Sequence, residues 1–203
     1  MQEEIYDDLK DMIIGNMQIQ TVGDPNFFDT DIGPIINDKA YKKLTSYISL
    51  CSEKGYKIHQ PNQKVSDMHI APTLIEINSI SNITEEQFGP ILHILKYSSN
   101  EIDKLINQIN RSEYGLTMGI HSRIEARADY MSSRSNVGNI YINRDMVGAV
   151  VGSQPFGGIG LSGSGFKAGG PNYLLQFVNE KVVSKNSVAF GGNTELLNIQ
   201  EDL

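Results

Sequence analysis

The sequence predicts an α/β fold in which a mostly parallel sheet is covered by helices. Segments with helical periodicity alternate along the chain with short apolar runs that are typical of buried strands. No segment repeats along the chain, and its 203 residues are enough for one substantial hydrophobic core. These observations favour one layered α/β unit.

The periodicities also predict the individual elements. Helices are expected over residues 3–17, 38–54, 100–109 and 122–133, and strands over residues 73–77, 91–97, 116–121 and 140–143. The residues on the apolar face of the first helix are Ile5, Leu9, Met12, Ile13 and Met17.

The second helix begins at a cap formed by Asn37 or Asp38. Its inward-facing residues are Leu44, Ile48 and Cys51. Asn100 is expected to cap the third helix. The strand over residues 91–97 is nearly all apolar, so we expect it at the centre of the sheet.

Composition and charge exclude several classes of protein. The net charge is -7 with acids and bases interspersed, and no basic patch suitable for a nucleic acid is visible. A single cysteine indicates a reducing, cytoplasmic compartment. The chain begins without the basic and apolar regions of a signal peptide, and no apolar run is long enough to span a membrane.

The most informative stretch is glycine-rich and covers residues 138–171. Nine of the nineteen glycines fall between Gly148 and Gly170. Such a density is expected where the backbone turns sharply or comes into contact with a ligand. Because a short strand leads into this stretch and Phe156 stands alone within it, the pattern predicts a binding loop.

The side chains most often used in catalysis point to no site by themselves. Cys51 lies on the apolar face of its helix without a histidine nearby in sequence, so we interpret it as a buried structural residue. The histidines lack the spacing of a zinc site, and they are His59, His69, His93 and His121. His93 falls in an apolar strand and is interpreted as a hydrogen-bonded core residue.

A dinucleotide fingerprint is also a weak interpretation here. Gly158, Gly160 and Gly163 have the G-x-G-x-x-G spacing, but no strand directly precedes them and the following residues are too glycine-rich for a helix. Glu85 and Glu86 precede a Phe-Gly-Pro turn. On the residues alone they are favoured as turn acids, with a carboxylate that contacts ribose hydroxyls as the alternative.

Two motifs, E-E-Q-F-G-P (85–90) and Q-P-F-G-G (154–158), occur in the order and spacing of the aldehyde dehydrogenase superfamily, whose C-terminal part this chain resembles. The finer resemblance is to the pyrroline-5-carboxylate (L-glutamate γ-semialdehyde) dehydrogenases. It rests on G-D-P, T-D-I-G-P, A-P-T-L-I-E-I, Y-G-L-T-M-G-I-H-S-R-I and the glycine-rich stretch. The tail N-S-V-A-F-G-G-N-T-E-L-L resembles the segment that follows this domain in the bifunctional proline-utilisation enzymes (PutA).

The resemblance implies an aldehyde dehydrogenase catalytic domain over residues 1–170, and a short oligomerisation strand with a C-terminal tail over residues 171–203. It implies NAD-dependent oxidation of glutamate semialdehyde to glutamate in proline degradation. Glu86 would hold the nicotinamide ribose of NAD, with Phe88 packed beside it. Gly148 and Ala149 would receive the substrate carboxylate through backbone N–H groups, and Phe156 would form an aromatic wall against its aliphatic part.

The family's nucleophilic cysteine lies in a G-Q-x-C type motif N-terminal to the first helix, so no catalytic residue is expected in this sequence. The chain alone is expected to be inactive and to bind NAD weakly. It would be either the C-terminal piece of a split enzyme, completed by a polypeptide that carries the cysteine, or a non-catalytic remnant or interaction module. Glu180 to Lys185 resembles part of the strand through which family dimers pair, so a homo-oligomer is expected.

Overall fold

The computed structural model describes residues 1–63, 65–186 and 189, and most of the predicted tail lies outside these residues. Helices and strands alternate along the described chain, as predicted. The helices are α1 (Tyr6–Ile19), α2 (Asp38–Glu53), α3 (Ile102–Arg111) and α4 (Glu125–Arg134). The strands are β1 (Lys57–His59), β2 (Thr73–Glu76), β3 (Ile91–Ile94), β4 (Tyr114–Gly115), β5 (Thr117–Ile120), β6 (Asn139–Ile142) and β7 (Ile159–Gly160).

The strands form three small sheets in the described chain. β2 lies between β1, with which it is antiparallel, and β3, with which it is parallel. β5 pairs in parallel with β6, and β4 pairs in antiparallel with β7. The predicted α/β class with parallel pairing is therefore confirmed, although the pairs belong to separate sheets.

The core of the first half is built on both faces of β2. Leu74 and Ile75 are both 0% exposed, and successive side chains of a strand point to opposite faces. Leu74 packs with Tyr6 and Met17 of α1, whereas Ile75 packs with Cys51 of α2. β2 is thus the central strand, and the prediction that the strand starting at Ile91 is central was wrong.

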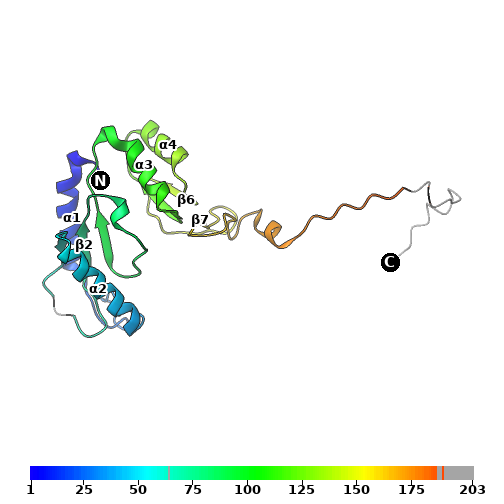
Figure 1. The fold of residues 1–203 in the computed structure, drawn as a ribbon. Helices are drawn as coiled ribbons and strands as arrows, with labels where there is room; N and C mark the ends of the chain where they lie inside the picture. Colours follow the sequence, from blue (N-terminus) through cyan, green and yellow to red (C-terminus); the bar gives the residue numbers. More distant parts are fainter. Residues whose placement is uncertain (64, 187–188, 190–203) are drawn as a thin grey trace.

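The core of the second half lies between the helix pair α3 and α4 and the parallel strands β5 and β6. Its buried residues are Ile106, Ile120, Ala128 and Met131. This packing fixes the position of β6, and the glycine-rich loop follows directly after the end of this strand (Figure 1).

Some predicted details of the elements were wrong. The first helix follows a 3₁₀ turn, and it buries Tyr6 and Met17 while Ile5 and Met12 remain exposed. Asn100 lies within another 3₁₀ turn and does not cap α3, which begins at Ile102. The predicted cap Asn37 is confirmed, because its side chain accepts a hydrogen bond from Ala40 N–H at 2.9 Å.

Beyond a last 3₁₀ turn (Tyr173–Phe177), the chain leaves the body as an extended segment over residues 178–186 (Figure 1). The oligomerisation strand expected at Glu180 to Lys185 falls here. It pairs with no other strand of the described chain, and its role stays a prediction.

Candidate functional site

The glycine-rich loop begins where β6 ends, at Asn143. This residue adopts a positive φ of 53°, which Asn tolerates better than most residues. Its side chain bonds the backbone of Ser122, accepting from the N–H and donating to the carbonyl, both at 2.9 Å. A tight turn follows, in which Val150 and Gln154 exchange backbone hydrogen bonds of 2.9 and 2.7 Å. The chain is thereby folded back over residues 148–154.

The two amides predicted to hold the substrate carboxylate lie at the start of this turn. Within the described residues, no acceptor is hydrogen-bonded to the N–H of Gly148 or Ala149. Gly148 has φ +128°, in the region that favours glycine. The Arg144 guanidinium donates to Val147 O at 3.2 Å and to Gln154 Oε1 at 3.1 Å, so it lies beside the amides, and it is also ion-paired with the Asp145 carboxylate at 3.4 Å. Unpaired N–H groups next to a guanidinium form a suitable site for a carboxylate.

Phe156 is half-buried on the returning part of the loop. Its N–H donates to Ala168 O at 3.1 Å, and its carbonyl accepts from Ala168 N–H at 2.8 Å. On the other side, the Asn139 side chain accepts from Gly157 N–H and donates to Pro155 O, each at 3.0 Å. The Lys167 ammonium donates a hydrogen bond to Gly157 O, and burial lowers the pKa of this lysine.

The glycines with dinucleotide-fingerprint spacing serve close backbone packing. Gly160 lies in β7 against β4, where an added Cβ would collide with Glu113 O. Gly158 is buried beside Ser162. No helix begins between residues 158 and 170, so the interpretation of these glycines as a dinucleotide fingerprint is rejected, as predicted.

The residues predicted to contact NAD lie on the connection from β2 to β3. Glu85 forms an exposed ion pair with Lys43 at 2.9 Å. Glu86 is exposed and has no hydrogen bond or ion pair with the described residues, so its carboxylate oxygens are free to accept. Phe88 is 80% exposed. Exposure of Glu86 and Phe88 is compatible with a turn acid and with a ligand contact, so their role in holding NAD stays a prediction.

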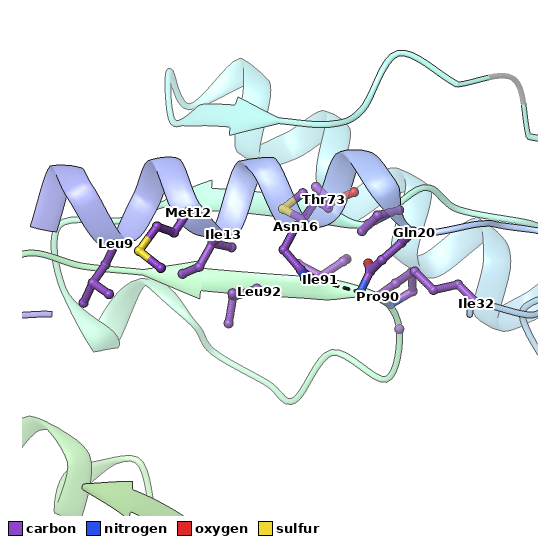
Figure 2. Close-up of a pocket in the computed structure, with 13 residues that line it drawn as sticks. Leu9, Met12, Ile13, Asn16, Gln20, Ile32, Thr73, Pro90, Ile91 and Leu92 are labelled. Atoms are coloured by element: carbon purple, nitrogen blue, oxygen red, sulfur yellow. Dashed lines mark hydrogen bonds between the residues drawn. The ribbon is translucent and has the colours of Figure 1, made fainter. Parts of the chain in front are cut away.

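An apolar groove of about 640 Å³ lies beside this connection, between α1 and β3. Figure 2 shows Leu9, Met12 and Ile13 of α1 and Ile91 and Leu92 of β3 among the side chains that line this groove. A second cavity of about 330 Å³ lies next to Pro155 and Lys167. Neither cavity is lined by Glu86, Phe88, Gly148, Ala149 or Phe156. The structure groups Gly148, Ala149 and Phe156 in one loop, and Glu86 and Phe88 in another.

The remaining candidates have structural surroundings. Cys51 is 2% exposed and packs with Ile75 and Ile77, which confirms that it is a core residue. His93 is half-buried and shares a 2.7 Å hydrogen bond with the Tyr47 hydroxyl, and burial lowers its pKa. Among the described residues, no group of three or more His, Cys, Asp or Glu is placed to hold a metal ion. No helix in this part of the chain has the length and apolar character needed to cross a membrane.

Sequence reasoning missed the side chains that support the loop. Asn139 and Tyr141 lie at alternate positions of β6 and therefore on one face of it. Asn139 brackets Phe156, and the buried Tyr141 hydroxyl donates to Gly148 O at 3.2 Å. The strand periodicity contained the signal that these two side chains share a face, but not which loop residues they contact.

Comparison with known proteins places this geometry in a family. The model of the aldehyde dehydrogenase family matches residues 1–183. The chain belongs to the aldehyde dehydrogenase family. Among curated relatives, the bifunctional protein PutA of Klebsiella aerogenes is 42% identical to this chain over 94% of the chain's length. The 1-pyrroline-5-carboxylate dehydrogenase 1 of Halalkalibacterium halodurans is 34% identical to it over 90% of the chain's length.

Solved structures agree with this placement. A crystal structure of proline utilization A from Bradyrhizobium japonicum matches 93% of this chain with 40% identity and a TM-score of 0.84. A 1-pyrroline-5-carboxylate dehydrogenase from Thermus, solved with bound NAD, matches 85% with 29% identity and a TM-score of 0.75. The chain spans only 15% of the Klebsiella protein, 36% of the Halalkalibacterium protein, and 19% and 34% of the two solved chains.

Proposed function

We propose that this chain provides the substrate-anchoring and nicotinamide-facing surface of an NAD-dependent L-glutamate γ-semialdehyde (pyrroline-5-carboxylate) dehydrogenase, a cytoplasmic enzyme that forms glutamate in proline degradation. The observation that carries the proposal is the pair of unpaired amides at Gly148 and Ala149, set beside Arg144 and followed by Phe156 in one loop. The 42% identity to a bifunctional protein PutA supports the same reaction.

The loop accounts for selectivity among aldehydes. The carboxylate of glutamate semialdehyde accepts hydrogen bonds from Gly148 and Ala149 N–H, and Phe156 packs against its methylene groups. An aldehyde that lacks the carboxylate leaves these donors without acceptors once water is excluded, which lowers kcat/KM for that aldehyde.

Glu86 and Phe88 are the residues proposed to hold NAD. The free carboxylate oxygens of Glu86 fit the hydroxyl groups of a ribose, and the exposed ring of Phe88 offers a surface for packing. NAD, when bound, accepts the hydride that leaves the aldehyde carbon. These two residues alone would give weak binding, because they contact neither the adenine nor the pyrophosphate.

The nucleophile has to come from another segment of polypeptide. Cys51 is the single cysteine of the sequence, and it is buried against β2 on the face covered by α2. We therefore propose that the 203 residues by themselves do not turn over, and that they work with a segment that carries a thiolate and a general base. The alternative, a non-catalytic module that binds itself or a partner chain, is supported by the extended segment 178–186 with its exposed valines.

A complementation assay tests this proposal. The chain is assayed for NADH formation from pyrroline-5-carboxylate and NAD, alone and mixed with a PutA relative that lacks the matching region. We expect NADH only in the mixture, and the same rate for Cys51→Ala. In the mixture, Glu86→Gln is expected to raise the KM for NAD about tenfold, the effect of one lost hydrogen bond to a charged group, whereas Glu85→Gln leaves it unchanged.

Two outcomes would contradict the proposal. Activity of the chain alone that Cys51→Ala abolishes would make Cys51 the nucleophile. A mixture in which the polypeptides bind each other but form no NADH would favour the interaction module instead.

A further inference from the structure

The strand β6 contacts both parts of the proposed substrate site through two of its side chains. Asn139 and Tyr141 lie two positions apart on the same face, so their Cα atoms are about 7 Å apart. Asn139 contacts the loop on either side of Phe156, and Tyr141 contacts it at Gly148. The strand β6 is therefore hydrogen-bonded both to the residues that flank Phe156, the predicted aromatic wall, and to Gly148, one of the two residues predicted to bind the substrate carboxylate.

The contact at Phe156 leaves little freedom to the backbone. In an extended segment, successive backbone groups point to alternate sides. The N–H and the carbonyl of Phe156 are both hydrogen-bonded to Ala168. The Asn139 amide donates to the carbonyl of Pro155 and accepts from the N–H of Gly157. The side chain of Asn139 thus replaces a neighbouring strand, and Lys167 adds a bond to Gly157 O.

The contact at Gly148 acts on the peptide that carries one of the anchor amides. The Tyr141 hydroxyl bonds Gly148 O, which belongs to the same peptide unit as Ala149 N–H. Because a peptide unit is planar, fixing its carbonyl also fixes the direction of that N–H. The Tyr141 ring is buried beneath the Arg144 guanidinium, which lies 5.0 Å from the ring centroid, so the hydroxyl has a supported position.

We infer that Asn139 and Tyr141 are positioning residues, which fix Phe156 relative to the Gly148 and Ala149 amides and so set the length of the carboxylate-bearing substrate that fits. This inference rests on the proposed function for the part that concerns substrate. The part that concerns loop positioning stands on the hydrogen bonds alone.

The chain offers matched controls for both residues. Asn110 brackets another loop in the same manner, donating to Arg134 O and accepting from Asn136 N–H, both at 2.8 Å. Tyr130 donates its hydroxyl to Asp103 at 2.6 Å on the exposed surface of α4. Neither residue belongs to the glycine-rich loop.

The first test measures amide hydrogen exchange by NMR in the full chain. We expect Asn139→Ala to speed exchange at Gly157 N–H about tenfold, as one lost hydrogen bond predicts, and Asn110→Ala to speed it only at Asn136. Asn139→Asp keeps the acceptor for Gly157 N–H and is expected to keep most of its protection. Unchanged exchange at Gly157 in a folded Asn139→Ala variant would overturn the positioning role.

The second test titrates glutarate and the shorter succinate, and follows the amide signals of Gly148 and Ala149. We expect the unaltered chain to prefer glutarate, and Tyr141→Phe and Asn139→Ala to lose at least about threefold of that preference, while Tyr130→Phe and Asn110→Ala keep it. An unchanged preference in the first two variants would overturn the setting of substrate length.

These outcomes separate the inference from the proposed function. If neither glutarate nor succinate shifts the amide signals of Gly148 and Ala149 in the unaltered chain, the proposed binding of the substrate carboxylate is contradicted. The proposed control of substrate length is then contradicted as well. Faster exchange at Gly157 in Asn139→Ala would still support the positioning role in that case.

Discussion

Glu76, the last residue of β2, is a largely buried carboxylate with two hydrogen-bond partners. It accepts from the Tyr6 hydroxyl at 2.9 Å and is bonded to His59 Nε2 at 2.8 Å. Burial by itself raises the pKa of Glu76. The hydrogen bonds from His59 and Tyr6 and the charges of Lys10 and Lys57 together outweigh it, so the pKa lies below its usual value. The folded state therefore favours the ionised form.

Replacing Glu76 with Gln is expected to destabilise the chain by about 1–2 kcal/mol at pH 7, as the loss of hydrogen bonds to a charged acceptor predicts. Because the folded pKa is depressed, this stability is present above the unfolded pKa and is lost as the pH falls through the folded value. Urea unfolding across acidic to neutral pH measures the difference. The difference in the free energy of unfolding between the unaltered chain and Glu76→Gln should become smaller as the pH falls. A difference that stays constant with pH would contradict the lowered pKa of Glu76.

The surface ion pair of Glu85 with Lys43 provides the control for this prediction. Both side chains are about half exposed, so Glu85→Gln is expected to change stability by less than about 0.5 kcal/mol at any pH. An equal loss of stability in the two variants would mean that the network around Glu76 adds nothing specific.

At the residue scale, the sequence was most informative where a pattern is local. The spacing of Cys51 from Leu44 and Ile48 predicted its burial. The density of glycines predicted a sharply turning binding loop; the positive φ of Gly148 confirms the turning backbone, and the binding role stays a prediction. The support of Phe156 by Asn139 was not predictable, because it depends on a loop that returns to its own strand after 16 to 18 residues. No periodicity records such a closure.

Gly15 in helix α1 and Gly55 in the turn after α2 allow the effect of backbone conformation on stability to be measured separately from steric contacts. An added Cβ at Gly15, within α1, or at Gly55 would meet nothing within 4 Å. They differ in backbone, since Gly55 has φ +78° whereas Gly15 is helical. Steric contacts are thus matched, and only the backbone conformation differs.

Gly15→Ala is expected to stabilise the chain by about 0.5–1 kcal/mol, because alanine loses less backbone entropy in a helix. Gly55→Ala is expected to destabilise it by about 1 kcal/mol, because L-residues with a Cβ disfavour the left-handed region. Thermal and urea unfolding of the two variants measure both effects. A change of the same sign in both would show that something other than backbone conformation decides.

At the element scale, long amphipathic patterns predicted the type and the bounds of an element correctly, whereas short patterns did not. The predicted second helix matches α2 (Asp38–Glu53) with its cap at Asn37. β1 (Lys57–His59) was missed, because three residues with two polar side chains carry no strand signal. The apolar run from Ile91 was predicted to reach residue 97, but the strand ends at Ile94. The rest of the run turns toward the start of the chain, where Tyr97 pairs with Gln2.

For the whole molecule, the pattern predicted the class of fold but not the partition of its strands. Alternating helices and strands favour parallel pairing, and both β2 with β3 and β5 with β6 are parallel. The separation into three sheets depends on which strands become neighbours in space. That choice depends on non-local packing, which the order of elements does not encode.

The extended segment over residues 178–186 carries the prediction of a homo-oligomer. Val182 is 83% exposed and Val183 is 64% exposed, and the segment pairs with no strand of the described chain. Over residues 178–185, no backbone N–H or carbonyl is hydrogen-bonded to another described residue, and an extended backbone with free groups is a template for pairing with another chain. We therefore expect the protein to self-associate through this segment, with the valines buried at the interface.

Changing both valines to Asp is expected to weaken self-association at least about a hundredfold, because each buried valine contributes about 1.5 kcal/mol and each 1.4 kcal/mol is a factor of ten. Sedimentation velocity over a range of concentrations measures the effect. Ile36→Asp is the control, since Ile36 is equally apolar and exposed but lies in the loop before α2. An unaltered chain that stays monomeric throughout would show the oligomer prediction to be wrong. Self-association that Ile36→Asp weakens as much as the valine changes would place the interface elsewhere.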